Sequence, residues 1–261
     1  MIRKILSGQG ALAGGRADIR QVLSEFVFLA AAVAAVAFFC QNTPVMSALA
    51  GGIILARFIL IGRRFDWVFL LIGIVAGGGN DMLSMAKGVY YYTPPHELAI
   101  PIPLWLLLFW GYVFVTFRQL FSLPAFRGEG FGGRPWRIDA RLIADLAVVI
   151  SFRLIIYHFV KHEPIPTIGY ASVLALRLLA IPPKARDWKL MTVVMIVGPI
   201  YEALLIRFGL YVYFDPVFLG MPAWLLIYWA FIIPIFMKGI FDRVEEWLAA
   251  KDSAAPVFAK G

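Results

Sequence analysis

Eight apolar segments follow one another along this 261-residue chain, each close to the roughly 20 residues that a helix needs to cross a bilayer. Only 15% of the residues are charged and the mean hydropathy is +0.81, which excludes a soluble globular domain. An open sheet cannot cross a bilayer because its edges leave backbone groups unpaired. The sequence therefore predicts an all-α, polytopic integral membrane protein. The expected helices are 21–40, 45–62, 67–89, 103–121, 140–160, 166–182, 188–209 and 222–241.

Arginine and lysine are concentrated in every second joint between these helices. The joints near residues 63, 130, 185 and 245 are basic, whereas the intervening joints hold only Lys161. Loops rich in lysine and arginine stay in the cytoplasm. We therefore expect a protein of the inner membrane with both termini in the cytoplasm. This topology accounts for the net charge of +8, so no nucleic-acid partner is expected.

The two halves of the chain carry the same residues in the same order. Asp66 recurs as Asp187 and Asp81 as Glu202, each 121 residues later, and GVYYY at 88–92 recurs as GLYVY at 209–213. With four helices in each half, the sequence predicts two parallel repeats related by a pseudo-twofold axis along the membrane normal. The expected order is a cytoplasmic N-terminal segment (1–20), repeat 1 (21–121), a cytoplasmic linker (122–139), repeat 2 (140–241) and a cytoplasmic C-terminal tail (242–261).

Two acidic residues lie at a depth where acids are costly. Asp81 and Glu202 each lie about sixteen residues, or roughly 25 Å, along a helix from a cytoplasmic turn. Buried carboxyl groups that face a pocket can act as proton donor and acceptor, so both are candidate catalytic residues. The alternative is a hydrogen-bonded structural pair between the repeats. Each acid follows an expected helix interruption, at glycines 77–79 and at Gly198-Pro199, although close helix packing also explains small residues there.

Four further polar side chains are candidates for substrate binding. Asn80 and Tyr201 directly precede the two acids and can orient an acid or a substrate. Arg153 and Tyr157 share one face of the fifth helix and have no polar counterpart in the first. Arg153 can hold an anionic or polar head group, and the alternative is that it only balances the charge of Glu202.

A second repeated set consists of one acid and one arginine in each half. Counting depth along each helical hairpin places Glu25 near Arg57 and Asp145 near Arg177. A lone buried charge is very costly, so we expect two structural ion pairs near the cytoplasmic side.

Aromatic residues near the expected helix ends are typical of the belts at membrane surfaces. The chain has one cysteine, Cys40, and three histidines, and it lacks a phosphate-binding glycine loop, an HExxH motif and an aspartate-rich motif. No metal and no cofactor are therefore expected. The expected belt residues are Trp67, Tyr90, Tyr91, Tyr92, Trp105, Trp188, Tyr211 and Tyr213.

Short segments of both halves resemble known membrane proteins. GVYYYT at 88–93 with PIPLW at 101–105 resembles part of the bacterial carotenoid-biosynthesis membrane family, which includes carotenoid hydratases. GPIYE at 198–202 with PAWL at 222–225 is similar to small bacterial membrane proteins of unknown function and to membrane-bound terpene and lycopene cyclases. Those enzymes protonate an alkene with buried acids. The resemblance implies that role for Asp81 and Glu202, in a lyase or isomerase.

Three functions are open at this point. The first is an integral-membrane enzyme that acts on an apolar, isoprenoid-like lipid through acid–base chemistry between Asp81 and Glu202. The second is a transporter or binding protein for a lipid or small molecule, with its site on the pseudo-twofold axis. The third is a non-catalytic membrane subunit. An apolar cavity open to lipid would favour the enzyme, a polar path open to one side would favour transport or binding, and the lack of a cavity would favour a structural role.

Overall fold

The computed structural model describes residues 19–96, 99–128, 130 and 134–254. Parts of the expected N-terminal segment, linker and tail, namely 1–18, 129, 131–133 and 255–261, lie outside the described residues. The helices are α2 (Ile19–Phe39), α3 (Thr43–Ile61), α4 (Asp66–Ala86), α5 (Leu104–Phe121), α6 (Ala140–Phe159), α7 (Pro164–Ala180), α8 (Ala185–Arg207), α9 (Ala223–Phe231), the π-helix η1 (Ile232–Met237) and α10 (Lys238–Ala254). The two strands are β1 (Tyr90–Tyr92) and β2 (Tyr211–Tyr213).

Most of the helices are long and apolar enough to cross a membrane. Among the described residues, seven helical stretches meet both criteria, and the 17-residue α7 is an eighth, shorter apolar helix. The prediction of a polytopic, helical membrane protein is confirmed, and the helix bounds differ from the expected ones by only a few residues, except at the C-terminal end.

The last span continues beyond the expected boundary at residue 241. Helix α9 runs through η1 into α10, so one helical stretch reaches Ala254. Pro234 lies within η1. Proline has no backbone N–H to donate and its ring clashes with the carbonyl four residues earlier, which accounts for the locally widened helix.

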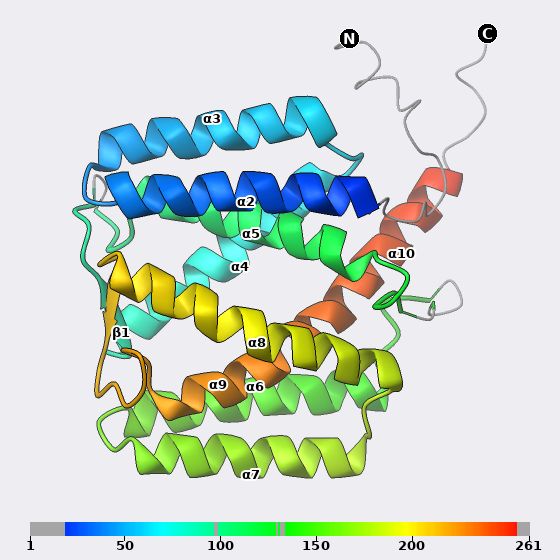
Figure 1. The fold of residues 1–261 in the computed structure, drawn as a ribbon. Helices are drawn as coiled ribbons and strands as arrows, with labels where there is room; N and C mark the ends of the chain where they lie inside the picture. The colour runs from blue at the N-terminus through cyan, green and yellow to red at the C-terminus, as the bar shows by residue number, and fades with distance from the viewer. Residues whose placement is uncertain (1–18, 97–98, 129, 131–133, 255–261) are drawn as a thin grey trace, which may run out of the picture.

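The helices pack mainly within each half of the chain, and the two halves pack in the same order. Helix α2 packs on α3, α3 on α5 and α4 on α5, while α6 packs on α7, α7 on α9 and α8 on α9. In Figure 1, the pair α2 and α3 lies along one side of the molecule and the pair α6 and α7 along the opposite side. The strands lie at one end of the helices, and α10 lies toward the other.

The two strands form a ribbon that was not expected from the sequence. They pair antiparallel, with Tyr90 opposite Tyr213 and Tyr92 opposite Tyr211. Each strand follows a glycine at positive φ, Gly88 (70°) or Gly209 (72°), directly after the end of α4 or α8. A left-handed residue at this position closes the helix and reverses the chain. The reversal brings each strand back beside the last turns of its own helix.

The expected helix interruptions are wrong. Helix α4 runs unbroken through glycines 77–79, and α8 runs unbroken through Pro199. A Cβ atom added to Gly77 would lie 2.7 Å from the ring of Trp110, and one added to Gly198 would lie 2.5 Å from the ring of Trp229. These contacts are too close for real side chains, so the two glycines serve close helix packing instead.

The aromatic residues divide into two groups, of which only one fits a membrane belt. Trp67 and Trp188 are 56% and 49% exposed, as a belt position requires. Trp105 is completely buried in the hydrophobic core, which corrects its expected belt position. Of the ribbon tyrosines, Tyr91 is exposed, whereas the four others point inward and carry a different role, described below.

Candidate functional site

A buried network of charges connects α2, α3, α4 and α5. Arg57 donates to Glu25, with 3.0 Å between Nε and Oε1, and also to Asp66. Arg118 on α5 reaches the other oxygen of Asp66 at 2.5 Å and also pairs with Glu245 on α10. Asp66 and Arg57 are completely buried. The sequence predicted the contact between Glu25 and Arg57 but missed Asp66 and Arg118, although the recurrence of Asp66 as Asp187 marked that position.

The corresponding residues of the second half make fewer contacts. Arg177 donates to Asp145 at 2.7 Å and to the carbonyl of Ile181. Asp187, the counterpart of Asp66, lies 3.7 Å from Arg141 and 3.8 Å from Arg186, and it accepts a bond from the backbone N–H of Lys184. Both halves therefore keep the first pair, but the fully bonded aspartate occurs only in the first.

Asp81 accepts hydrogen bonds from three aromatic donors. The Tyr90 hydroxyl donates to one carboxylate oxygen, and the Tyr92 hydroxyl and the Trp110 indole donate to the other. The tyrosines lie nine and eleven residues after the acid, so the period of two in a strand puts both on the same face. The Asn80 side chain lies near the same carboxylate. Asp81 is 1% exposed.

Glu202 repeats this arrangement at the same spacing. Its carboxylate accepts a hydrogen bond from the Tyr213 hydroxyl, eleven residues on, and Tyr211, nine residues on, lies close to the same carboxylate. Because Tyr213 faces Tyr90 and Tyr211 faces Tyr92 across the ribbon, all four tyrosines share the face that lies next to the two acids. Tyr201 makes no hydrogen bond through its hydroxyl to a described residue, and its ring packs against the core.

The tyrosines of the ribbon contact both acids. Both acids are buried, and each accepts at least one hydrogen bond from a ribbon tyrosine. A small apolar cavity lies elsewhere, between α2, α3 and α5. A general acid or base has to reach the proton that it transfers. Hydrogen bonds from the tyrosines to Asp81 and Glu202 connect the ribbon to helices α4 and α8.

Arg153 contacts only uncharged groups. Its Nη2 donates to the Tyr228 hydroxyl at 2.7 Å, and Nη1 lies 3.4 Å from the Ser84 hydroxyl. No carboxylate pairs with Arg153 in the described part of the chain, so the ion pair with Glu202 considered from the sequence does not form. Its guanidinium lies 5.9 Å from the ring of Tyr157, whose buried hydroxyl has no hydrogen-bond partner.

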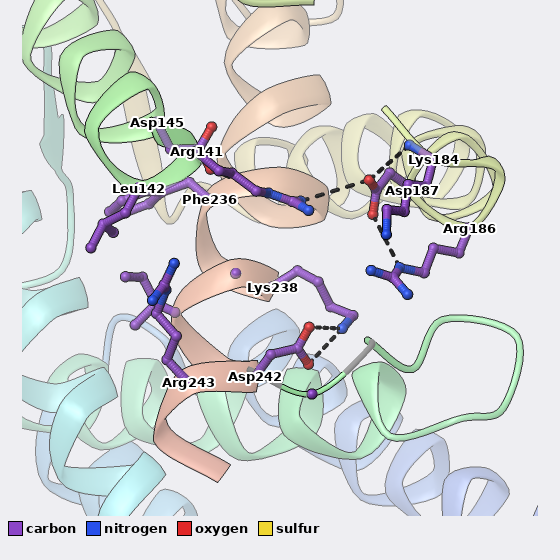
Figure 2. A pocket seen from close by; sticks show the side chains of 13 residues that line it. Arg141, Leu142, Asp145, Lys184, Arg186, Asp187, Phe236, Lys238, Asp242 and Arg243 are labelled. Atoms are coloured by element: carbon purple, nitrogen blue, oxygen red, sulfur yellow. Dashed lines mark hydrogen bonds and ion pairs between the residues drawn. The ribbon is translucent and has the colours of Figure 1, made fainter. Parts of the chain in front are cut away.

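A polar cavity of about 170 Å³ opens at the other end of the helices, near the linker. Figure 2 shows its charged side chains, which come from α6, from the start of α8 and from α10. In the described residues, no group of three or more His, Cys, Asp or Glu side chains is placed to hold a metal ion. The cavity is lined by Gly130, Arg141, Leu142, Asp145, Lys184, Arg186, Asp187, Phe236, Lys238, Gly239, Ile240, Asp242 and Arg243.

Comparison with known proteins identifies the fold and a partial family match. A family described as "Protein of unknown function (DUF2878)" matches residues 158–248. No curated protein matches the chain. The fold is similar to that of a mycobacterial Insig homolog, MvINS from Mycobacterium vanbaalenii, with 19% identity, a TM-score of 0.50, and coverage of 67% of this chain and 91% of that one. A cross-linked MvINS trimer gives a TM-score of 0.51 at 19% identity, covering 71% and 94%.

Proposed function

We propose that this chain, a membrane protein with an Insig-like fold, is a non-catalytic lipid-binding protein of the inner membrane with both termini in the cytoplasm. Its ligand is an amphipathic lipid with one polar head and an apolar, isoprenoid-like body. Arg153 and Tyr157 receive the polar head. Asp81 and Glu202 hold the ribbon against the helices and take no part in chemistry.

The observation that carries this proposal is the set of unmet hydrogen-bonding and charge requirements around Arg153. An arginine inside a membrane helix is costly unless an anion or several polar groups surround it. Arg153 has two hydroxyl partners and no acid, and the Tyr157 hydroxyl beside it is buried without a partner. A head group with acceptor oxygens supplies what both side chains lack.

The acid–base enzyme predicted from the sequence has less support, because its two acids already accept hydrogen bonds from tyrosines of the ribbon. If Asp81→Asn and Glu202→Gln removed a lipid product from cells while leaving the amount of folded protein unchanged, the enzyme would be restored as the better interpretation.

The binding function is tested by mass spectrometry of lipids extracted from the purified protein. We expect a lipid species that copurifies with the natural chain to be lost from Arg153→Gln and reduced in Tyr157→Phe. The matched control is Arg64→Gln, because the Arg64 side chain is 50% exposed and pairs with Asp252. Equal lipid content in all four proteins would refute the proposal.

A further inference from the structure

The loop between β2 and α9 exposes several large apolar side chains. All residues from 214 to 219, which we call the apolar loop, are exposed. Phe214, Val217, Phe218 and Leu219 are 47%, 65%, 53% and 59% exposed. In Figure 1 this loop lies beside the ribbon, at the same end of the helices. Apolar side chains gathered in this way mark a surface that contacts a membrane or another protein.

A tight hairpin fixes the tip of the apolar loop. The N–H of Met221 donates to the carbonyl of Phe218 at 2.7 Å, and Leu219 and Gly220 between them have φ values of 49° and 81°. A two-residue turn with positive φ at both positions favours asparagine and glycine. Leucine is strained in this conformation. The tip therefore carries an apolar side chain where a small polar one would suit the backbone better.

The hairpin lies against the last turn of α8. A Cβ atom added to Gly220 would lie 2.7 Å from Cγ2 of Ile206, which is the second-to-last residue of that helix. The 23 residues of α8 span about 35 Å, slightly more than the roughly 30 Å hydrocarbon core of a bilayer. The end of α8 therefore reaches the boundary between acyl chains and head groups, and the apolar loop lies at that boundary.

The side chains around the apolar loop suit a lipid surface. On α8, Ile200 and Leu204 are 58% and 42% exposed, as expected of side chains that face acyl chains. The ammonium group of Lys161, between α6 and α7, lies 5.9 Å from the ring centre of Phe214. A lysine beside an apolar surface can extend its charged end to the head groups. The apolar loop thus continues the lipid-facing surface of α8 and has a cation next to it.

We propose that the apolar loop inserts into the bilayer on the side where the ribbon lies, with Val217, Phe218 and Leu219 in contact with acyl chains. The loop binds the lipid surface itself, and Lys161 lies at the level of the head-group phosphates. Burial of the three apolar side chains offsets the backbone strain at the tip. This surface shares no residue with the proposed lipid site at Arg153 and does not depend on it.

Fluorescence quenching tests the insertion. Starting from Cys40→Ala, the variant Phe218→Cys carries a nitrobenzoxadiazole group in the full chain, which is reconstituted in phosphatidylcholine nanodiscs. One quencher is aqueous iodide, and the other is phosphatidylcholine with a doxyl group near the top of an acyl chain. We expect the doxyl lipid to lower the emission about twofold or more and iodide to have little effect, because the side chain lies among acyl chains.

Two labelled positions serve as controls. The label at Ile200→Cys, on the lipid-facing side of α8, responds to the doxyl lipid, and the label at Lys161→Cys, in an exposed turn at the same end, responds to iodide. Quenching of position 218 by iodide, as at position 161, would place the apolar loop in water. Protection of position 218 from both quenchers would mean that protein covers it. Either result overturns the proposal.

Leu219→Asn gives a second readout that needs no label. Asparagine tolerates positive φ, so this change would stabilise a hairpin in water, whereas among acyl chains it buries an amide and loses apolar contact. We expect the thermal unfolding midpoint in nanodiscs to fall. The matched control is Asp215→Asn, in the same loop and also at positive φ (53°), which leaves the midpoint unchanged. An equal or higher midpoint for Leu219→Asn than for the natural chain overturns the proposal.

Discussion

At the scale of single residues, the ribbon tyrosines explain why two acids are tolerated in the membrane. Tyr90 and Tyr92 donate to Asp81, whereas Tyr91 between them points away and is 58% exposed. We expect Tyr92→Phe to lower the free energy of unfolding by about 1–3 kcal/mol, because it removes a donor from a buried carboxylate. Tyr91→Phe, the matched control, should change it little. Denaturant titration in micelles measures the free energy of unfolding of both variants. Equal losses would contradict a stabilising hydrogen bond between Tyr92 and Asp81.

The shared arginine of the first half gives a second prediction. Arg57→Leu leaves Glu25 and Asp66 buried without their common partner, so we expect a loss of about 3–5 kcal/mol in the free energy of unfolding. Adding Glu25→Gln should recover only part of this loss, because Asp66 keeps its charge. The control Arg64→Leu breaks an exposed pair and should cost about 0–1 kcal/mol. Full recovery in the double variant would show that Asp66 does not depend on Arg57.

The sequence predicted pairs of residues better than networks. Depth counting along two helices places Glu25 beside Arg57, because both belong to one hairpin. Asp66 and Arg118 meet through the packing of α4 on α5, and the sequence pattern does not encode the rotation of each helix about its axis. The ribbon tyrosines were assigned to a belt for a related reason. Their positions near helix ends indicate their depth in the membrane but not the direction in which their side chains point.

At the scale of elements, the three consecutive glycines in α4 allow a need for close packing to be distinguished from a need for a flexible helix. Gly77 faces the ring of Trp110, whereas a Cβ on Gly79 would meet nothing within 4 Å. We expect Gly77→Ala to destabilise the fold by about 1–3 kcal/mol through overpacking. Gly79→Ala should be neutral or stabilising by at most about 1 kcal/mol, because alanine favours a helix. Melting temperatures of the two variants in micelles test this, and similar effects would argue for a flexible α4.

Hydropathy located the membrane helices but missed the ribbon and η1. Each strand has only three residues, and its partner lies in the other half of the chain, so no local pattern marks it. The signal that was available is the recurrence of an acid, a glycine seven residues on, and tyrosines nine and eleven residues on. In η1, the sequence offered only Pro234, and a proline in an apolar run does not by itself distinguish a kink from a π-helix.

At the scale of the whole molecule, the ribbon and the charge networks lie at opposite ends of the helices. The ribbon joins the two halves at one end through paired strands and four tyrosines. At the other end, Arg118 connects the first half to Glu245 on α10, and Arg243 holds the linker through Asp139 and the carbonyl of Arg137.

The number of membrane crossings depends on α7, the shortest of the apolar helices. Its 17 residues span about 26 Å, slightly less than the roughly 30 Å hydrocarbon core. It packs on α6, is held by Tyr170 donating to the carbonyl of Phe152 and by Arg177 bonding Asp145, and lies alongside α6 in Figure 1. A small mismatch is accommodated by local thinning of the bilayer. We therefore expect α7 to cross the membrane.

Cysteine labelling tests this crossing, starting from Cys40→Ala so that the buried native thiol does not react. Single cysteines replace three exposed residues: Arg137 before α6, Lys161 between α6 and α7, and Lys184 after α7. If both helices cross and the basic loops are cytoplasmic, an impermeant maleimide added to intact cells labels position 161 alone, and positions 137 and 184 react only after lysis. Labelling of 184 together with 161 would mean that α7 returns to the side it came from, which would leave seven crossings and place the C-terminus outside.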